Sequence, residues 1–442
     1  MEKNNFRKIA TITLFESAVQ WYCFLLYGTA AGTVFHKVFF SQTGNGTTAL
    51  ILSYMSFAIG YIAGPFGAVF FGHIGDRKGR KVTMYASLLM MGISTSIIGI
   101  LPPAASAGVG VVIVLQLMRL AQCFGRGGTW GGGILMAYEN VPENKRSFYA
   151  AIPQIGLPIG FGLSSILIAV PTLLLPEDIF FTWGWRIPFL AAIILTVIVI
   201  RQKGEMMETE DYKKAQAKLE AEEAEGKKHK VGFIPMVKGY WKTLLLGCGT
   251  RWVDGTFYNI FIVWILSYCI NWLGMPLIQT YIITIIACIF KIPFTLFGGW
   301  CAQKLGNTRT FVIGALASAV LSIPTLKVIE LSKGNLAITI IGIVLGWSIA
   351  YNLIWAVISS LWSSYFETEV RYSGISFVYH VPSFLVAGMV PTICTLLINY
   401  GKGDTIYVGI YSTVVALISA ACALALKARH DQIGRASCRE RV

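Results

Sequence analysis

The chain has 442 residues, of which 55% are apolar and 13% charged, and its mean hydropathy is +0.64. This composition leaves too little polar surface for a soluble globule of this size, so it predicts an integral membrane protein in contact with lipid. The formal net charge is +14. We expect no nucleic-acid partner, because the basic residues are distributed over many short segments instead of one face.

Twelve apolar stretches are each long enough to cross a bilayer as a helix, which takes roughly 20 residues. Six lie on each side of a long polar segment, and all are continuous rather than alternating. The sequence therefore predicts an all-α membrane protein with twelve transmembrane helices in two six-helix halves. The stretches cover residues 11–36, 50–72, 82–101, 109–135, 148–171, 185–201, 243–270, 277–302, 309–328, 336–362, 374–398 and 406–427.

The polar segment divides the chain. Residues 201–242 hold ten Lys/Arg and eight Asp/Glu, and residues 205–225 are rich in Ala, Glu and Lys, which predicts a solvated helix. The last twelve residues break the composition and are interpreted as a non-native tail. The predicted parts are a first half at 1–201, a cytoplasmic linker at 202–242, a second half at 243–430 and the tail at 431–442.

In the first half, polar side chains recur at helical spacing. Glu16, Gln20 and Tyr27 share one stripe of the first stretch, and Arg119, Gln122, Arg126 and Trp130 share one stripe of the fourth. The fifth stretch carries Gln154 between two prolines. Small residues at 60, 64 and 67 predict close packing of the second stretch. We expect both stripes to face the protein interior.

The second half also carries charged residues in the interior of its predicted spans. Arg251 and Asp254 are three residues apart and can pair along one helix face. Lys291 lies deep in the eighth stretch. The tenth and eleventh stretches add the polar or titratable candidates Asn352, Trp355 and His380.

Exposure of these charges to lipid would cost roughly 2.5–3.5 kcal/mol each, so we expect them to line a central cavity. The cavity would then hold four cations, Arg119, Arg126, Arg251 and Lys291, and two carboxylates, Glu16 and Asp254. The excess of positive charge predicts an anionic metabolite as cargo. Arginine suits a planar carboxylate because its fork donates two parallel hydrogen bonds.

Several motifs together resemble the metabolite:proton symporters of the major facilitator superfamily. They lie at residues 20–28, 72–81, 119–122, 127–132, 148–156, 183–189 and 370–374. The resemblance implies alternating access by a multi-pass protein of the bacterial inner membrane, with proton symport of organic acids or of zwitterions such as proline and betaine. It also implies a cytoplasmic gating loop, comprising Gly72, Gly75, Asp76, Arg77, Gly79, Arg80 and Lys81.

The basic residues of this loop and of other segments on the same side predict that both termini are cytoplasmic.

No nucleophile triad, phosphate loop or metal cluster is present in the sequence, so we expect no enzyme activity, cofactor or metal. We expect a monomer. The substrate-binding candidates are the polar and aromatic residues Arg119, Arg126, Gln122, Trp130, Tyr27, Gln20, Gln154, Arg251, Lys291, Asn352 and Trp355.

Proton coupling is the point at which the chain departs from the family. Gln20, Cys23 and Thr129 replace residues that are usually acidic in relatives. A proton would then have to be carried by Glu16, Asp254 or His380, and we favour Glu16. Two alternatives stay open, namely an exchanger or facilitator without proton coupling, and a sensor that binds its substrate without transporting it.

Overall fold

The computed structural model describes residues 3–42, 45–78, 80–139, 146–202, 233–366 and 371–439, and over these ranges every regular element is helical. The predicted linker helix at 205–225 lies outside the described residues. The helical elements of the first half are α1 (Lys3–Ala30), η1 (Ala31–Phe35), α2 (His36–Val38), α3 (Gly46–Lys78), α4 (Arg80–Ile100), α5 (Ala104–Ala107), α6 (Val109–Glu139), α7 (Arg146–Ala150), η3 (Pro153–Ile155), α8 (Gly156–Leu174), α9 (Glu177–Ile179), η4 (Phe180–Gly184) and α10 (Arg186–Gln202).

The second half repeats this plan. Its elements are α12 (Phe233–Asn259), η6 (Ile260–Trp264), α13 (Ile265–Asn271), α14 (Leu277–Leu305), α15 (Asn307–Leu331), α16 (Leu336–Ile343), η7 (Val344–Ala350), α17 (Asn352–Ser363), α18 (Arg371–His380), η8 (Phe384–Gly388), α19 (Val390–Tyr400) and α20 (Ile406–Arg439). α20 continues through residues 431–439, the start of the predicted tail.

Ten helical spans of the described chain are long and apolar enough to cross a membrane, and the bent pair Ser373–His380 and Phe384–Tyr400 makes an eleventh. The remaining predicted stretch, 11–36, is continuous helix in α1, η1 and the start of α2. Polar residues such as Glu16 and Gln20 make this stretch less hydrophobic than the ten spans. The fold is thus an all-α membrane protein.

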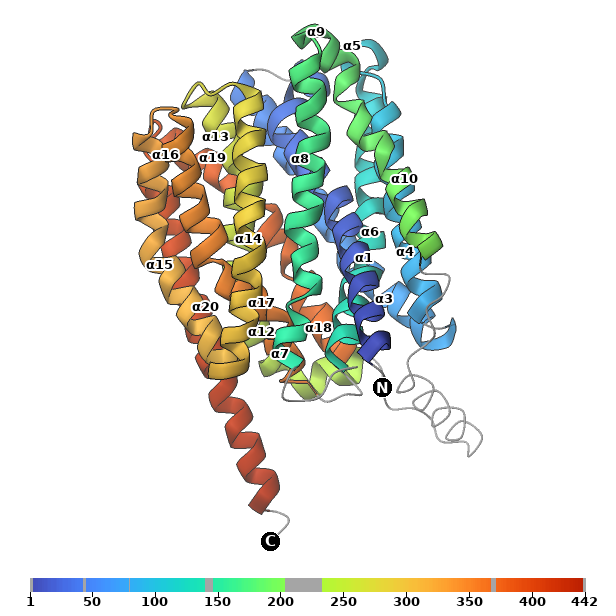
Figure 1. Cartoon of the computed structure of the whole chain (residues 1–442), viewed down its shortest axis with the longest axis vertical. Coiled ribbons are helices and arrows are strands. Elements are labelled where there is room, and N and C mark those ends of the chain that lie inside the picture. Colours follow the sequence, from blue (N-terminus) through green and yellow to red (C-terminus); the bar gives the residue numbers. More distant parts are fainter. Residues whose placement is uncertain are drawn as a thin grey trace.

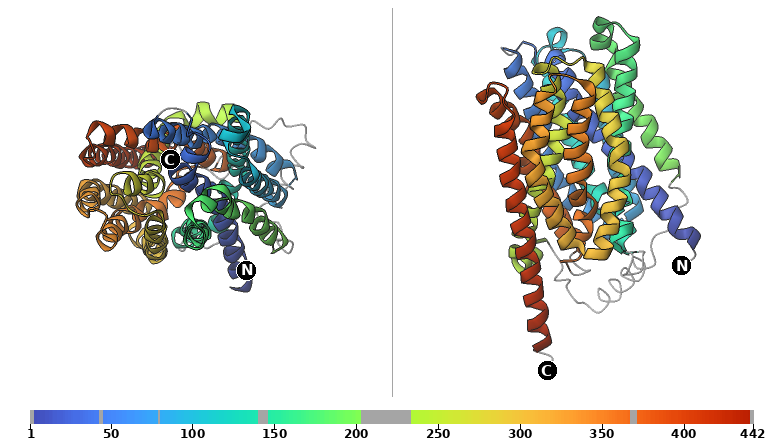
Figure 2. Two further views of the ribbon diagram at one scale, coloured as in Figure 1. Left: turned by 90° about the horizontal axis from the view of Figure 1, so that it is seen from above. Right: turned by 60° about the vertical axis from the view of Figure 1, so that its left-hand side comes forward.

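The helices form one elongated bundle with two sides (Figure 1). The first-half helices α3, α4, α6 and α10 lie on one side, and α15, α16 and α20 lie on the other. α3 packs against α18 and η8, and α8 packs against α14, so these elements form the boundary between the halves. α1 begins and α20 ends at the same end of the molecule, where α20 projects beyond the bundle (Figure 2).

Three glycines of α3 permit its close packing. A Cβ atom on Gly67 would lie 1.9 Å from the Phe124 carbonyl oxygen, and one on Gly60 would lie 2.6 Å from Arg119 Nε, so both glycines let α3 approach α6. Gly64 instead faces the second half, where its Cβ would lie 2.8 Å from His380 Nδ1. The predicted packing role is confirmed, and at Gly64 it extends across the boundary.

The prediction of a loop at residues 72–81 is wrong, because most of the backbone there is helical. Residues 72–78 continue α3 as helix, and Arg80 and Lys81 begin α4, while Gly79 lies outside the described residues. A helix ends where its backbone hydrogen bonding ends, not where the apolar run ends. The side chains of Gly72, Gly75, Asp76, Arg77, Arg80 and Lys81 are likewise outside the described part, so the gating role stays a prediction.

Candidate substrate site between the halves

Arg119 of α6 is fully buried and is held entirely by the first half. Its guanidinium carbon lies 4.5, 4.4 and 4.6 Å from the ring centres of Phe24, Tyr27 and Phe57. It donates hydrogen bonds to the Gln122 side chain and, over 3.4 Å, to the Phe57 carbonyl. Three aromatic rings thus surround this cation.

Gln122 and Tyr27 complete a brace around Arg119. The Gln122 amide nitrogen donates to the Cys23 carbonyl at 2.9 Å and to Thr95 Oγ1 at 2.7 Å, and the Tyr27 hydroxyl hydrogen-bonds Ser56. These contacts join α1, α3, α4 and α6. They give Gln122 and Tyr27 a structural role, whatever their role in binding.

Arg126, two turns further along α6, lies at the boundary between the halves. Its guanidinium carbon is 3.8 Å from the ring centre of Phe24 and 4.7 Å from that of Trp21, and its Nη2 donates to the hydroxyl of Tyr379 in α18. Only 3% of Arg126 is exposed. Its Nε has no hydrogen-bond acceptor among the described residues. Arg126 is therefore a buried cation that contacts the second half through Tyr379 and keeps a spare donor at Nε.

Arg251 and Asp254 of α12 form a buried ion pair, which confirms the predicted pairing. Tyr351 donates a hydrogen bond to the other oxygen of Asp254. The guanidinium carbon of Arg251 lies 4.4 Å from the ring centre of Tyr379. Tyr379 consequently touches one cation from each half, Arg126 through its hydroxyl and Arg251 through its ring.

Lys291 of α14 is fully buried. Its ammonium group donates to Asn352 Oδ1 at 3.0 Å and lies 4.6 and 4.4 Å from the ring centres of Trp347 and Tyr351. The Asn352 amide nitrogen donates back to the Lys291 carbonyl at 2.8 Å. Tyr351 also donates a hydrogen bond to Asp254, so its ring links Lys291 to the Arg251–Asp254 ion pair.

Gln154 and Trp355 join the halves directly. Trp355 Nε1 donates to the Gln154 carbonyl at 3.0 Å, and Gln154 Nε2 donates to the Trp355 carbonyl at 3.2 Å. The Trp355 ring meets the Trp21 ring edge-on at 5.4 Å. Two of the predicted binding residues are thus brought together across the boundary.

The remaining candidates are more scattered. Gln20 and Glu16 of α1 are both 2% exposed, and Glu16 interacts electrostatically with Tyr85 of α4. His380 is buried against Gly64, and its ring lies 4.9 Å from that of its neighbour Tyr379. The side chain of Trp130 is outside the described part.

Charge is unevenly balanced in this interior. Within the described residues, Arg251 has a carboxylate partner, whereas Arg119, Arg126 and Lys291 have none. A buried charge without a counterion costs several kcal/mol of free energy. The arrangement can accept an anion.

Sequence reasoning did not assign Tyr351 or Trp21 to this interior. Both are aromatic residues in stretches rich in apolar and aromatic residues. Helical spacing identifies neighbours along one helix, but it does not show which phenol or indole contacts another helix.

Comparison with known proteins agrees with this architecture. A sequence model described as "Major Facilitator Superfamily" matches residues 21–387. Over 437 residues the chain is 33% identical to "Inner membrane metabolite transport protein YhjE" of Escherichia coli, covering 97% of this chain and 96% of that protein. It is 31% identical over 428 residues to the "Shikimate transporter" of the same organism, covering 95% and 94%.

Among solved structures, the proton:xylose symporter XylE bound to 6-bromo-6-deoxy-D-glucose superposes with a TM-score of 0.73. The two chains are 16% identical, and the match covers 96% of this chain and 95% of the symporter. At this identity the similarity concerns the fold alone. The family match, the relatives and the fold agree: this chain belongs to the major facilitator superfamily and is a multi-pass membrane transporter, not an enzyme.

Proposed function

We propose that the protein carries a small metabolite with a carboxylate group across the membrane by alternating access of its two halves. The observation that supports this proposal is Arg126, a buried cation at the boundary between the halves with no carboxylate partner among the described residues and a spare Nε donor. An anionic ligand would supply the missing counterion. The name of one relative, a shikimate transporter, agrees with such a cargo.

In this proposal Arg126 holds the carboxylate in two parallel hydrogen bonds. The hydroxyl of Tyr379 occupies one guanidinium nitrogen in the structure, and the substrate would displace it or share it. The rings of Trp21, Phe24 and Trp355 provide an apolar surface for the body of the metabolite. Arg119, enclosed by rings of its own half, would set the positive potential without direct contact.

We further propose proton symport, with Glu16 as the group that binds and releases the proton. Asp254 is engaged by Arg251 and Tyr351, and His380 is packed between Gly64 and Tyr379. Glu16 is a buried carboxylate on another helix, apart from that pair. A carboxylate in such a position can change its protonation during a transport cycle.

The test is uptake of labelled shikimate, 2-oxoglutarate, citrate and proline into proteoliposomes, with and without an inward proton gradient. We expect at least one acid to accumulate only with the gradient. Glu16→Gln should abolish this accumulation but retain exchange of internal for external substrate, because exchange needs no net proton release. Asp178→Asn, a change at an exposed carboxylate, is the matched control and should behave as wild type.

Two outcomes would reject parts of the proposal. Exchange without gradient-driven accumulation in the wild type would reject symport and favour the exchanger or facilitator. Binding of an acid without any uptake would favour the sensor.

For orientation, we propose that both termini are cytoplasmic. A cysteine introduced at Gly46 should then react with impermeant reagents only from outside. Cysteines at Lys78 and Gly226 should react only from the cytoplasm. Reaction of residue 46 from the cytoplasmic side would reverse the assignment.

A further inference from the structure

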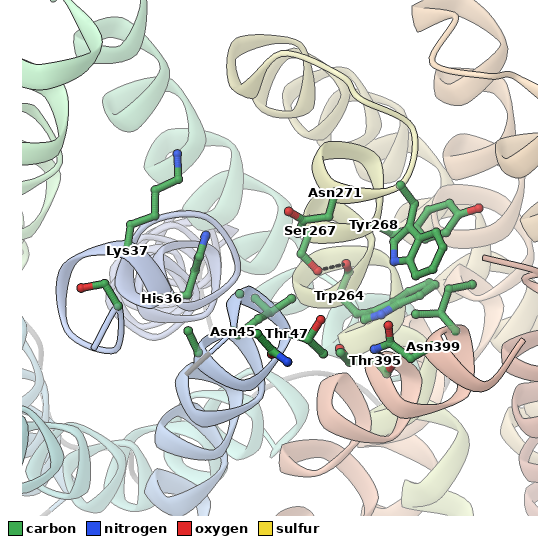
Figure 3. Close-up of a pocket in the computed structure, with 16 residues that line it drawn as sticks. His36, Lys37, Asn45, Thr47, Trp264, Ser267, Tyr268, Asn271, Thr395 and Asn399 are labelled. Atoms are coloured by element: carbon green, nitrogen blue, oxygen red, sulfur yellow. Dashed lines mark hydrogen bonds between the residues drawn. The ribbon is translucent and has the colours of Figure 1, made fainter. Parts of the chain in front are cut away.

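We infer that the protein has a second, outer binding site for its carboxylate substrate, in a cavity of about 600 Å³ at the end of the molecule opposite its termini (Figure 3). The inference rests on the proposed function, since it assumes a carboxylate cargo. The cavity lies between the two halves and is large enough for a small metabolite with bound water.

The described walls of the cavity carry hydrogen-bond donors and no acidic side chain. Figure 3 shows Lys37 and Asn45 of the first half on one side, and Asn271 and Asn399 of the second half on the other. None of the described residues that line the cavity is Asp or Glu. Amide groups and one ammonium group, without a competing carboxylate in the lining, favour an anion over a cation.

The donors are accessible to a ligand. Asn45 Oδ1 accepts from the Thr48 backbone and hydroxyl at 2.9 and 3.0 Å, so its NH₂ group remains as the donor. Lys37 pairs with Glu177 at 3.5 Å, but their side chains are 53% and 80% exposed. An exposed pair of this kind is weak, so Lys37 can exchange its partner for a substrate carboxylate.

Aromatic rings provide the complementary surface. Trp264 and Tyr268 line the second-half wall and stack on each other with ring centres 5.2 Å apart. The Tyr268 hydroxyl donates to the Gly403 carbonyl at 3.3 Å, which fixes the ring. Trp272, which also lines the cavity and is 42% exposed, offers the ring on which the body of the metabolite can lie while its carboxylate meets the amides.

The floor of the cavity separates it from the central cations. The Tyr54 hydroxyl bonds Ser267 Oγ at 2.7 Å and the Val263 carbonyl at 3.3 Å, across the boundary between the halves. Gly60, which contacts Arg119, lies six residues further along α3, or about 9 Å along the helix axis. A solute that enters from this end must therefore wait in the outer cavity until the floor opens.

The test is equilibrium dialysis of the purified full chain with labelled shikimate, 2-oxoglutarate, citrate and proline. We expect two classes of site for the substrate. The double variant Asn271→Ala/Asn399→Ala should weaken the lower-affinity class at least about tenfold, as expected for the loss of hydrogen bonds to a charged group. Arg126→Gln should remove the higher-affinity class. Gln279→Ala, an amide on the same end outside the cavity, should leave both unchanged.

The outcomes separate the two ideas. One class of site that is lost in Arg126→Gln and unchanged in the double variant overturns the outer site and leaves the proposed function intact. No binding of any of the four compounds to the wild type overturns the proposed function itself. Retention of the higher-affinity class in the double variant shows that this variant is folded. In proteoliposomes it should raise KM at least about fivefold and leave kcat unchanged.

Discussion

The two halves neutralise their buried cations in different ways. In the second half, Arg251 has its own carboxylate, Asp254, which also accepts a hydrogen bond from Tyr351. In the first half, Arg119 and Arg126 are surrounded by aromatic rings and have no carboxylate partner among the described residues. The buried arginine of the second half thus has a counterion, and Lys291 alone there has none, whereas these two buried arginines of the first half lack one among the described residues.

Magnitudes support this distinction. A cation over an aromatic ring gains about 0.5–2 kcal/mol, whereas burial of a charge costs several kcal/mol. The rings around Arg119 and Arg126 therefore offset only part of the burial cost. Arg119 is enclosed within its own half, so Arg126, at the boundary, is the cation to which we assign the substrate.

The largest expected effect comes from disrupting the Arg251–Asp254 ion pair of the second half. Asp254→Asn leaves Arg251 buried without its counterion and should lower the free energy of unfolding by about 3–5 kcal/mol. Thermal unfolding in detergent measures this loss. Asp178→Asn, an exposed change, is the control, and replacement of both Arg251 and Asp254 by leucine should recover much of the loss. An Asp254→Asn variant as stable as wild type would contradict the self-neutralised pair.

Removal of Arg126, the cation without a carboxylate partner among the described residues, should change stability little and substrate binding strongly. Arg126→Gln eliminates a buried charge together with its ring contacts and its bond to Tyr379, so we expect the unfolding free energy to change by no more than about 1 kcal/mol. The rise in melting temperature that the substrate produces in wild type should be largely lost, because only weak binding remains. If Arg126→Gln were as destabilising as Asp254→Asn, the contrast between the halves would be lost.

The sequence predicted these elements to different degrees. The apolar runs identified the helices because bilayer thickness sets their length, and the Arg251–Asp254 pair followed from a spacing of three residues along one helix. The contact of Tyr379 with Arg126 joins residues 253 positions apart. It depends on how α6 and α18 pack, which no local spacing encodes.

The predicted loop at residues 72–81 shows a related limit. The sequence there changes from apolar to basic, which marks a change from lipid to water. The backbone hydrogen bonds of a helix can continue from lipid into water. α3 accordingly continues through Lys78.

A smaller effect tests the contact between the halves. Tyr379→Phe removes the hydroxyl that accepts from Arg126 but keeps the ring over Arg251, so it should lower stability by about 1 kcal/mol. Because the Arg126 guanidinium is then available to substrate, carboxylate affinity should stay equal or rise. A steep fall in affinity, measured by the same dialysis, would mean that the Tyr379 hydroxyl itself binds the substrate.

The smallest effect concerns the turn between α19 and α20, which contains Asp404. Lys327 donates to Asp404 at 2.7 Å, as does the Ile406 backbone, and these bonds hold the pKa of Asp404 below its ordinary value of about 3.9. The ionised carboxylate therefore stabilises the fold above that ordinary pKa, and the contribution is lost as pH falls through the lowered value. Asp404→Asn should melt slightly below wild type at neutral pH, and the difference should shrink on acidification. A difference that grew at low pH would contradict this assignment.

The most direct test of the central claim is competition in proteoliposome uptake between a transported acid and its uncharged primary amide, in wild type and in Arg126→Gln. If Arg126 supplies the unmatched charge for the substrate, wild type should prefer the acid over the amide by about 30-fold or more, equivalent to at least 2 kcal/mol. In Arg126→Gln that preference should disappear while weak binding of both compounds remains. An Arg126→Gln protein that still prefers the acid by the wild-type factor would contradict the account.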